Sequence, residues 1–151
     1  MYESSNDELS PIEEQEAISG MASSLSGYLP ENWKWARFFI MFMGEYAIRR
    51  MEVEKEDGEV TRISLPTSFI MRAMEIRSGM YKQNRGTWFS WELMLWSEGK
   101  FKSKFNYTDF PPFTFGPDPD DFLEEMRIFP RSEEFTPGWL QEKIDEANRG
   151  E

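Results

Sequence analysis

The chain has 151 residues, enough for one domain with a substantial core, and its 13 Phe, 6 Trp and 5 Tyr exclude a disordered polypeptide. It contains no Cys and no His, which excludes disulfides, thiolate metal sites and nucleophilic sites built on Cys–His or Ser–His. The net charge is −11, and no apolar run approaches the roughly 20 residues that span a bilayer, so no membrane partner is expected.

The charge is divided unevenly along the chain. Residues 1–31 hold seven acidic and no basic residues, residues 32–110 hold ten and thirteen, and residues 111–151 hold eleven and four. Because phosphate contacts dominate binding to nucleic acids, this chain is a poor candidate for a nucleic-acid partner and a better one for a basic protein. The alternative is that the acidic ends only keep the protein dispersed. The acidic start also lacks the basic and apolar regions of a secretory signal, which predicts a cytoplasmic protein.

Residues 1–9 predict a polar tail, followed by a single domain over residues 10–151. The first helix is predicted to begin at the capping box Ser10-Pro11-Ile12-Glu13, with Pro at the first helical position, and to end near Gly27–Pro30. Its apolar stripe follows i, i+3, i+4, i+7 spacing and contains Ile18, Met21, Ala22, Leu25, Tyr28 and Leu29.

Three strands are predicted next. Trp33–Met43 is apolar on both faces, which predicts a strand near the middle of a sheet or covered on both sides, and Gly44 ends it. Tyr46–Lys55 and Glu59–Leu65 flank a three-residue loop, Glu56-Asp57-Gly58. This loop sets Met51 opposite Ile63, Val53 opposite Thr61 and Glu52 opposite Arg62.

A second helix is predicted to open at Pro66-Thr67-Ser68, with Thr67 or Ser68 as its cap. Asn84-Arg85-Gly86 is predicted to stop it before the next strand. Its buried stripe is expected to contain Phe69, Ile70, Ala73, Met74, Met80 and Tyr81.

The stretch Thr87–Tyr107 predicts a β-hairpin with a defined register. Apolar residues occupy odd positions in both arms, and a two-residue loop would set Leu95 opposite Lys102. A three-residue loop, Ser97-Glu98-Gly99, sets odd opposite odd, and Gly99 supplies the left-handed residue at its end. The predicted pairs are Leu95 with Phe101, Trp91 with Phe105 and Phe89 with Tyr107 on the apolar face, and Trp96 with Lys100, Met94 with Lys102 and Glu92 with Lys104 on the other. Glu92 and Lys104 are expected to form an ion pair.

Residues 111–151 predict a Pro-rich, acidic, helical C-terminal extension. Asp118-Pro119 and Thr136-Pro137 each combine a cap residue with a Pro at the first helical position. The inward residues are predicted to be Phe122, Met126 and Phe129 in the first of these helices and Trp139, Leu140, Ile144 and Ala147 in the second. The whole order is α-β-β-β-α-β-β-α-α, which predicts an α+β fold in which an antiparallel sheet of about five strands packs with helices.

The remaining candidates for chemistry are carboxylates. The densest cluster is Asp118, Asp120, Asp121, Glu124 and Glu125, which a hydrolase would need to place across a cleft. Nothing in the sequence marks such a cleft, and acidic residues at the start of a helix are ordinary dipole and capping residues. A calcium site at Asp118 and Asp120 lacks the turn Gly and closing Glu of a calcium loop, and no Gly-rich phosphate loop occurs. No enzymatic activity, metal or cofactor is therefore expected.

Three lysines, Lys100, Lys102 and Lys104, form a row on one predicted strand among aromatic residues. Such a row can belong to a sheet that stacks nucleic-acid bases. In the predicted register, however, Phe101 and Phe105 face away from the lysines. The row therefore predicts a solvated strand face that also protects an edge strand from aggregation.

Two motifs resemble the YezG-like family of bacterial immunity proteins (antitoxins). Leu29-Pro30-Glu31-Asn32-Trp33 is similar to the family's I-P-E-x-W segment, and residues 99–109, GKFKSKFNYTD, are similar to its G-K-F-K-x-x-F-x-Y-x-D hairpin. The resemblance covers roughly residues 10–110. It implies a cytoplasmic protein that neutralises a secreted polymorphic toxin, with nuclease toxins of type VII secretion as the best-known targets.

The toxin-binding residues are not part of these motifs, so charge supplies the hypothesis. An acidic surface suits a basic toxin, and its predicted members are Asp118, Asp120, Asp121, Glu124, Glu125, Glu133 and Glu134. Binding would cover the toxin's active site or disrupt its fold. The alternatives are a secretion chaperone or adaptor that uses the same surface, and a small carboxylate-based hydrolase.

Overall fold

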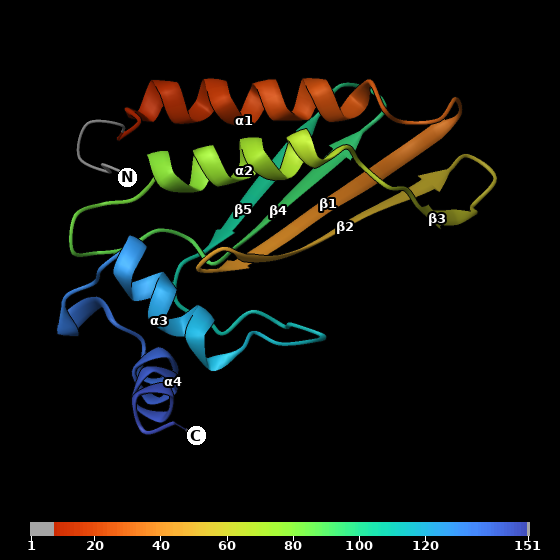
Figure 1. Cartoon of the computed structure of the whole chain (residues 1–151). Helices are drawn as coiled ribbons and strands as arrows, with labels where there is room; N and C mark the ends of the chain where they lie inside the picture. Colours follow the sequence, from red (N-terminus) through yellow and green to blue (C-terminus); the bar gives the residue numbers. More distant parts are fainter. Residues whose placement is uncertain (1–7, 151) are drawn as a thin grey trace.

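The computed structural model describes residues 8–150 and shows the predicted α+β fold, with the elements in the predicted order (Figure 1). A five-stranded antiparallel sheet has the strand order β3-β2-β1-β4-β5. The elements are α1 (Pro11–Ser26), β1 (Trp33–Met43), β2 (Tyr46–Lys55), β3 (Val60–Arg62), α2 (Thr67–Gly79), β4 (Ser90–Trp96), β5 (Phe101–Asn106), α3 (Pro119–Ile128), the 3-10 helix η2 (Glu133–Phe135) and α4 (Gly138–Asn148). Most of the predicted polar tail lies outside the described residues, but Leu9 is partly buried and packs against the main core.

Both hairpins have the predicted three-residue loops. Gly58 and Gly99 take positive φ angles of 88° and 99°, which side chains with a Cβ rarely adopt. The confirmed pairs are Glu52 with Arg62 and Val53 with Thr61 in one hairpin, and Trp91 with Phe105, Glu92 with Lys104, Met94 with Lys102 and Leu95 with Phe101 in the other. The alternation of apolar and polar side chains therefore predicts the register of both hairpins correctly.

The predicted ion pair between Glu92 and Lys104 is wrong, although the two residues lie opposite each other. The Glu92 carboxylate instead accepts a hydrogen bond from Nε of Arg37 on β1 at 2.6 Å. Arg37 also lies 3.5 Å from a carboxylate oxygen of Glu52 on β2. The central strand thus places the Arg37 guanidinium between the Glu52 and Glu92 carboxylates, and Lys104 does not pair with Glu92.

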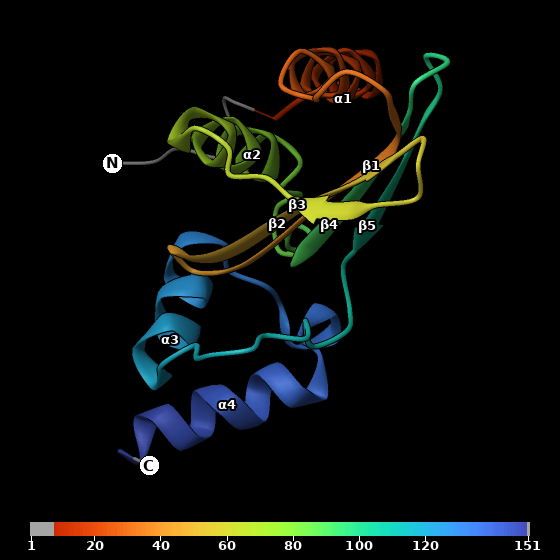
Figure 2. The same cartoon turned by 90° about the vertical axis from the view of Figure 1, so that its right-hand side faces the viewer.

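α1 and α2 cover one face of the sheet and bury the main core (Figure 2). Successive side chains of a strand point to opposite faces, so alternate residues of each strand enter this core. Its buried strand residues include Ala36, Phe38, Ile40, Phe42, Met51, Val53, Trp91, Leu93 and Leu95. The Trp91 ring stacks on Phe105 with centroids 5.3 Å apart and meets Phe38 edge-on, which joins the β4–β5 hairpin to β1.

Residues 111–150 pack as a C-terminal layer against the opposite face of the sheet (Figure 2), at one end only (Figure 1). Met43, Phe89, Phe122 and Leu140 form a second buried core there. The predicted placement of Phe89 beside Tyr107 on the apolar face is wrong. Phe89 precedes β4 and meets Trp139 with ring centroids 5.0 Å apart. The strand Trp33–Met43 is therefore covered on both faces only near its C-terminal end.

Helix ends were predicted less well than hairpins. The capping box of Ser10 and Glu13 is confirmed. Pro66 and Pro137, however, are the N-caps of α2 and α4, so Thr67, Ser68 and Thr136 do not cap these helices. α2 ends at Gly79, before the predicted stop, and β3 is shorter than predicted.

The helical stripes were predicted in part. Tyr28 is 52% exposed because α1 ends at Ser26, before the stripe reaches it. Met74 is also exposed, and Ile76 and Arg77 occupy the buried side of α2 instead. Among the helices of residues 8–150, none combines the length and the apolar composition needed to cross a bilayer.

Candidate binding surface

A buried ion pair attaches α3 to the sheet. Nη2 of Arg77 on α2 donates to both carboxylate oxygens of Glu125, at 2.8 and 2.7 Å. Arg77 Nε donates to the Trp88 carbonyl oxygen at 2.8 Å, and Glu125 Oε1 also accepts from the Gly44 amide at 2.8 Å. Glu125 is 0% exposed, so its predicted role as a toxin contact is wrong. The helical phase that buries Phe122 also turns Glu125 inward.

A second arginine fixes the segment after α3. Arg131 Nη2 donates to the Thr87 carbonyl oxygen at 2.6 Å, and Nη1 donates to that of Phe135 at 3.0 Å. The guanidinium lies 4.4 Å from the Phe89 ring centroid. Burial lowers the pKa of Arg131, and the negative charge of Glu125 opposes that shift. Two buried cations, Arg77 and Arg131, therefore hold the C-terminal layer in place.

The start of α3 presents carboxylates next to the turn between β1 and β2. Asp118 and Asp121 form a capping box, in which the Asp121 carboxylate accepts a hydrogen bond from the Asp118 amide at 2.8 Å. Asp120 is exposed. A Cβ added to Gly44 would lie 2.8 Å from the Asp121 carbonyl oxygen. The helix thus packs directly on the turn, and its first acidic residues combine exposure with a structural role.

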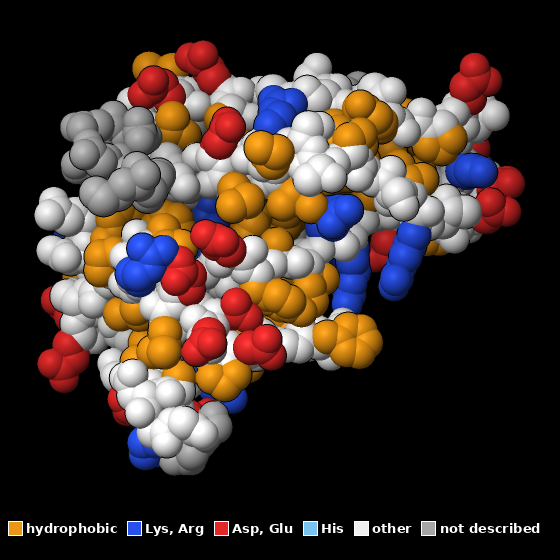
Figure 3. Space-filling model, viewed as in Figure 1, with side chains coloured by type: hydrophobic (Ala, Val, Ile, Leu, Met, Phe, Trp, Pro, Cys, Tyr) orange, Lys and Arg blue, Asp and Glu red, His pale blue; other side chains and the backbone are white. Residues whose placement is uncertain are grey.

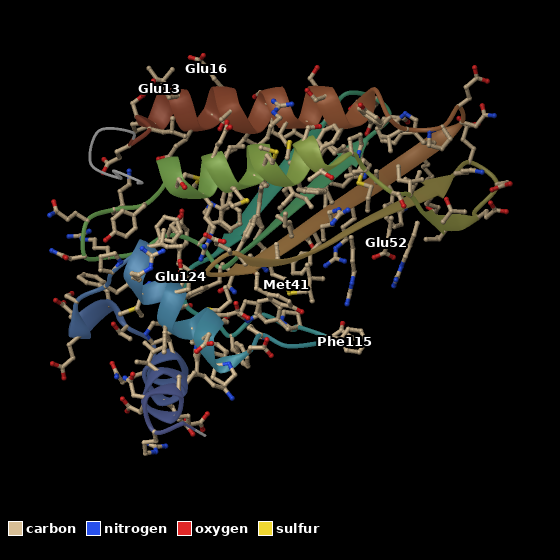
Figure 4. All side chains as sticks on the ribbon, viewed as in Figure 1. Glu13, Glu16, Met41, Glu52, Phe115 and Glu124 are labelled. Carbon is tan, nitrogen blue, oxygen red and sulfur yellow. The ribbon has the colours of Figure 1, made fainter. Side chains whose placement is uncertain are left out.

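Glu124 lies one turn further along α3 (Figure 4) and forms an ion pair with Arg127. The hydrogen bonds from Arg127 hold the pKa of Glu124 below its ordinary value. Glu45, in the β1–β2 turn, is exposed and contributes to raising the pKa of the same arginine. The sequence prediction omitted Glu45, because only the docking of α3 on Gly44 brings that turn to the acidic helix.

These residues form a surface that we name the α3 acidic patch. Acidic side chains gather over the lower half of the molecule in Figure 3, where α3 lies. The members of the patch are Glu45, Asp118, Asp120, Asp121 and Glu124.

An aromatic side chain projects beside this patch. Phe115 is 77% exposed and stands at the tip of the segment before α3 (Figure 4). The Tyr46 hydroxyl donates a hydrogen bond to the Phe115 carbonyl oxygen, and Arg50 Nη2 donates to Thr114 Oγ1 at 2.8 Å. Two side chains of β2 therefore hold the segment that presents Phe115.

The structure does not bring the whole predicted set together. Glu133 and Glu134 are exposed in η2, beyond the C-terminal end of α3, whereas Asp118 and Asp120 lie at its start. α3 has ten residues, which corresponds to about 15 Å of helix. Glu133 and Glu134 therefore form a separate acidic site and are not members of the α3 acidic patch.

The candidate calcium site at Asp118 and Asp120 has no third ligand. Within residues 8–150, no group of three or more acidic side chains is arranged to hold a metal ion. Asp121, the nearest further carboxylate in the chain, is used by the Asp118 amide.

Comparison with protein-family models gives no match to this chain, and neither does comparison with curated proteins. The likeness to the YezG-like family therefore rests on the two motifs at Leu29–Trp33 and residues 99–109. Neither motif contains a residue of the α3 acidic patch.

Proposed function

We propose that this chain is a cytoplasmic immunity protein that binds and neutralises a cognate secreted toxin. The observation that carries the proposal is the α3 acidic patch with Phe115 projecting beside it. Binding surfaces on proteins commonly join an aromatic anchor to a polar rim, and carboxylates in that rim suit a basic partner. The motif resemblance to immunity proteins points to the same class of partner.

The proposed mechanism is exclusion of the toxin's substrate. A nuclease binds its polyanionic substrate with basic side chains, which carboxylates can occupy in its place. The exposed carboxylates Asp120 and Glu45 mainly raise the association rate by long-range attraction. Phe115 contributes to the lifetime of the complex because it can be buried on contact.

The test is co-expression with a candidate toxin, followed by measurement of toxin activity and association rate. We expect a stable complex with loss of toxin activity. Glu45→Lys with Asp120→Lys should slow association about tenfold or more at low salt and flatten its dependence on salt.

Glu133→Lys with Glu134→Lys is the matched control, since it makes the same charge change at the other end of α3. It should leave the association rate near that of the wild type. Equal rates for all three proteins would overturn the assignment of the patch. Undiminished toxin activity with no complex would overturn the immunity function, whereas a complex that leaves the toxin active would favour a secretion chaperone or adaptor.

A further inference from the structure

Part of the sheet is left uncovered on the face that carries the C-terminal layer. Because directly paired residues share a face, the strand registers identify the side chains that point away from α1 and α2. We name those beyond the C-terminal layer, together with Arg50, which borders the layer at Thr114, the open face. They are Trp35, Arg37, Phe39, Ile48, Arg50, Glu52, Glu54, Val60, Arg62, Glu92, Met94, Trp96, Lys102 and Lys104.

The open face has an aromatic centre and a basic rim. Trp35, Phe39 and Trp96 lie on the central strands β1 and β4 and are half-buried. Arg62 on β3 and the pair Lys102 and Lys104 on β5 are exposed at the two edges of the sheet. Aromatic, Met and Arg side chains surrounded by polar ones are the composition of a protein interface.

The charge of the open face is opposite to that of the layer beside it. The face holds five cations and three carboxylates, a net of +2, although the whole chain has a net charge of −11. Residues 111–150 hold ten acidic and four basic residues, a net of −6. The basic and acidic surfaces therefore lie on the same side of one sheet.

The shape of the molecule allows the basic surface of one molecule to contact the acidic surface of another. The C-terminal layer hangs below one end of the sheet, which gives an L shape in Figures 1 and 3. Lys and Arg side chains project from the sheet into the angle of the L in Figure 3, and Glu52 points into it in Figure 4.

The acidic tip of the L is the outer side of α4. Leu140 turns toward the second core and Lys143 lies 5.9 Å from the ring centroids of Phe110 and Phe122, so both side chains face inward. Glu142 and Asp145 are exposed on the other side of the helix. The tip therefore presents carboxylates that a second molecule can reach.

We propose that the open face is the docking surface for a second copy of this chain. In a two-fold symmetric dimer, the α4 tip of each copy lies in the angle of the other, with Glu142 and Asp145 against its basic rim. Such an interface is closed and self-complementary, because each copy supplies one acidic and one basic surface. The proposal uses different residues from the α3 acidic patch and does not depend on the proposed function, but Phe115 projects into the same angle (Figure 4) and would be covered by the second copy.

A nucleic acid fits the open face less well. Glu52 and Glu92 lie in its middle and take up Arg37, the most central cation, at 3.5 and 2.6 Å. A phosphate backbone would meet these carboxylates at close range. A protein surface with charges of both signs can match this arrangement.

The test begins with the mass of the purified full chain in light scattering at micromolar concentration and low salt. We expect twice the mass of one chain, falling toward one chain at about 0.5 M NaCl, where the Debye length is about 4 Å. A monomer at low salt would overturn the proposal. If the protein is a monomer and binds a single-stranded oligonucleotide or polyglutamate through Lys102 and Lys104, the open face is a binding site for that polymer and not for a second copy.

Charge exchange then tests the geometry. Lys102→Glu with Lys104→Glu makes the open face acidic, and Glu142→Lys with Asp145→Lys makes the α4 tip basic. Each variant alone should dimerise at least tenfold more weakly than the wild type. An equimolar mixture of the two should form a heterodimer, because both of its contacts are then attractive.

Glu16→Lys with Glu75→Lys is the control, since it reverses two exposed carboxylates on α1 and α2, on the other side of the sheet. It should leave the dimer intact. A wild-type dimer that both rim variants and tip variants leave unchanged would overturn the proposal, as would a mixture that stays monomeric.

Discussion

Arg77 and Glu125 form a bidentate ion pair whose side chains are only 2% and 0% exposed. They are 48 positions apart in the chain and come from the two layers on opposite faces of the sheet. The guanidinium also lies 4.8 Å from the Phe129 ring centroid and 5.3 Å from that of Phe42. The pair therefore connects α2, α3 and the end of β1 at a single point.

Removing one partner of this pair should strongly destabilise the fold. Glu125→Ala leaves a buried guanidinium without its counter-ion and the Gly44 amide without its acceptor. The expected loss is about 3–5 kcal/mol in the free energy of unfolding, measured by urea denaturation. Glu124→Ala, at the neighbouring partly exposed position, should cost less than about 1 kcal/mol.

A double-mutant cycle separates the pair from its surroundings. Arg77→Met with Glu125→Ala removes both charges, so its cost should be smaller than the sum of the two single changes. Additive costs would show that each residue acts through its own backbone hydrogen bonds and not through the ion pair.

Gly44 should tolerate no side chain. Its φ is +61°, and an added Cβ would lie 2.8 Å from the Asp121 carbonyl oxygen. Gly44→Ala therefore combines a left-handed backbone penalty of about 1–2 kcal/mol with overpacking of about 1–3 kcal/mol. The measurement is thermal or urea unfolding.

Gly58→Ala is the matched control for Gly44→Ala. Its φ is +88°, but nothing lies within 4 Å of the added Cβ, so only the backbone penalty applies. Equal destabilisation by both changes would contradict the close approach of α3 to the β1–β2 turn.

The sequence predicted those parts of the fold that alternation and turn chemistry determine. Alternating apolar residues and a Gly at the end of each loop were enough to give the registers around Trp91 and Val53. The same alternation did not predict how the C-terminal layer packs against the sheet. Arg77, Glu125 and Arg131 are charged, so pattern alone places them at the surface. The contacts that bury them include Arg77 with Glu125 and Arg131 with Thr87, which are 48 and 44 positions apart.

The candidate site was predicted only as a region. Composition predicted Asp120 and Glu124. Glu45 belongs to the surface only because α3 docks beside it, and Glu125 is buried and does not belong to it. Phe115 was missed because its exposure depends on the segment held by Tyr46 and Arg50. Which residues share this surface therefore depends on tertiary packing and cannot be predicted from the local sequence pattern.

The start of α1 should lose a stabilising interaction in acid. The Ser10 amide donates to the Glu13 carboxylate at 2.9 Å, and the Ser10 hydroxyl accepts from the Glu13 amide at 3.1 Å. The hydrogen bonds from Ser10, the backbone one first, lower the pKa of Glu13. A lowered folded pKa means that the stabilisation is complete above the unfolded pKa and disappears as pH falls through the folded one.

Glu13→Gln removes the titrating group and keeps an acceptor. The wild type should be more stable than this variant at neutral pH, and the difference should shrink as pH falls below the ordinary glutamate range. An NMR titration of the Glu13 carboxyl should show a midpoint below that range. A midpoint at the ordinary value would remove the capping box as the cause.

Phe115 should matter for binding and not for folding. Its ring is 77% exposed, so Phe115→Ala should change the free energy of unfolding by less than about 0.5 kcal/mol. If the ring is buried by the toxin, the same change should weaken the complex by about 2 kcal/mol, or about 30-fold in Kd, mostly through faster dissociation. Ile12→Ala removes an apolar side chain that is 71% exposed on α1 and should change neither quantity. Equal affinity of the Phe115 and Ile12 variants would show that the toxin contacts the carboxylates without this anchor, because a buried aromatic ring cannot be removed from an interface at no cost.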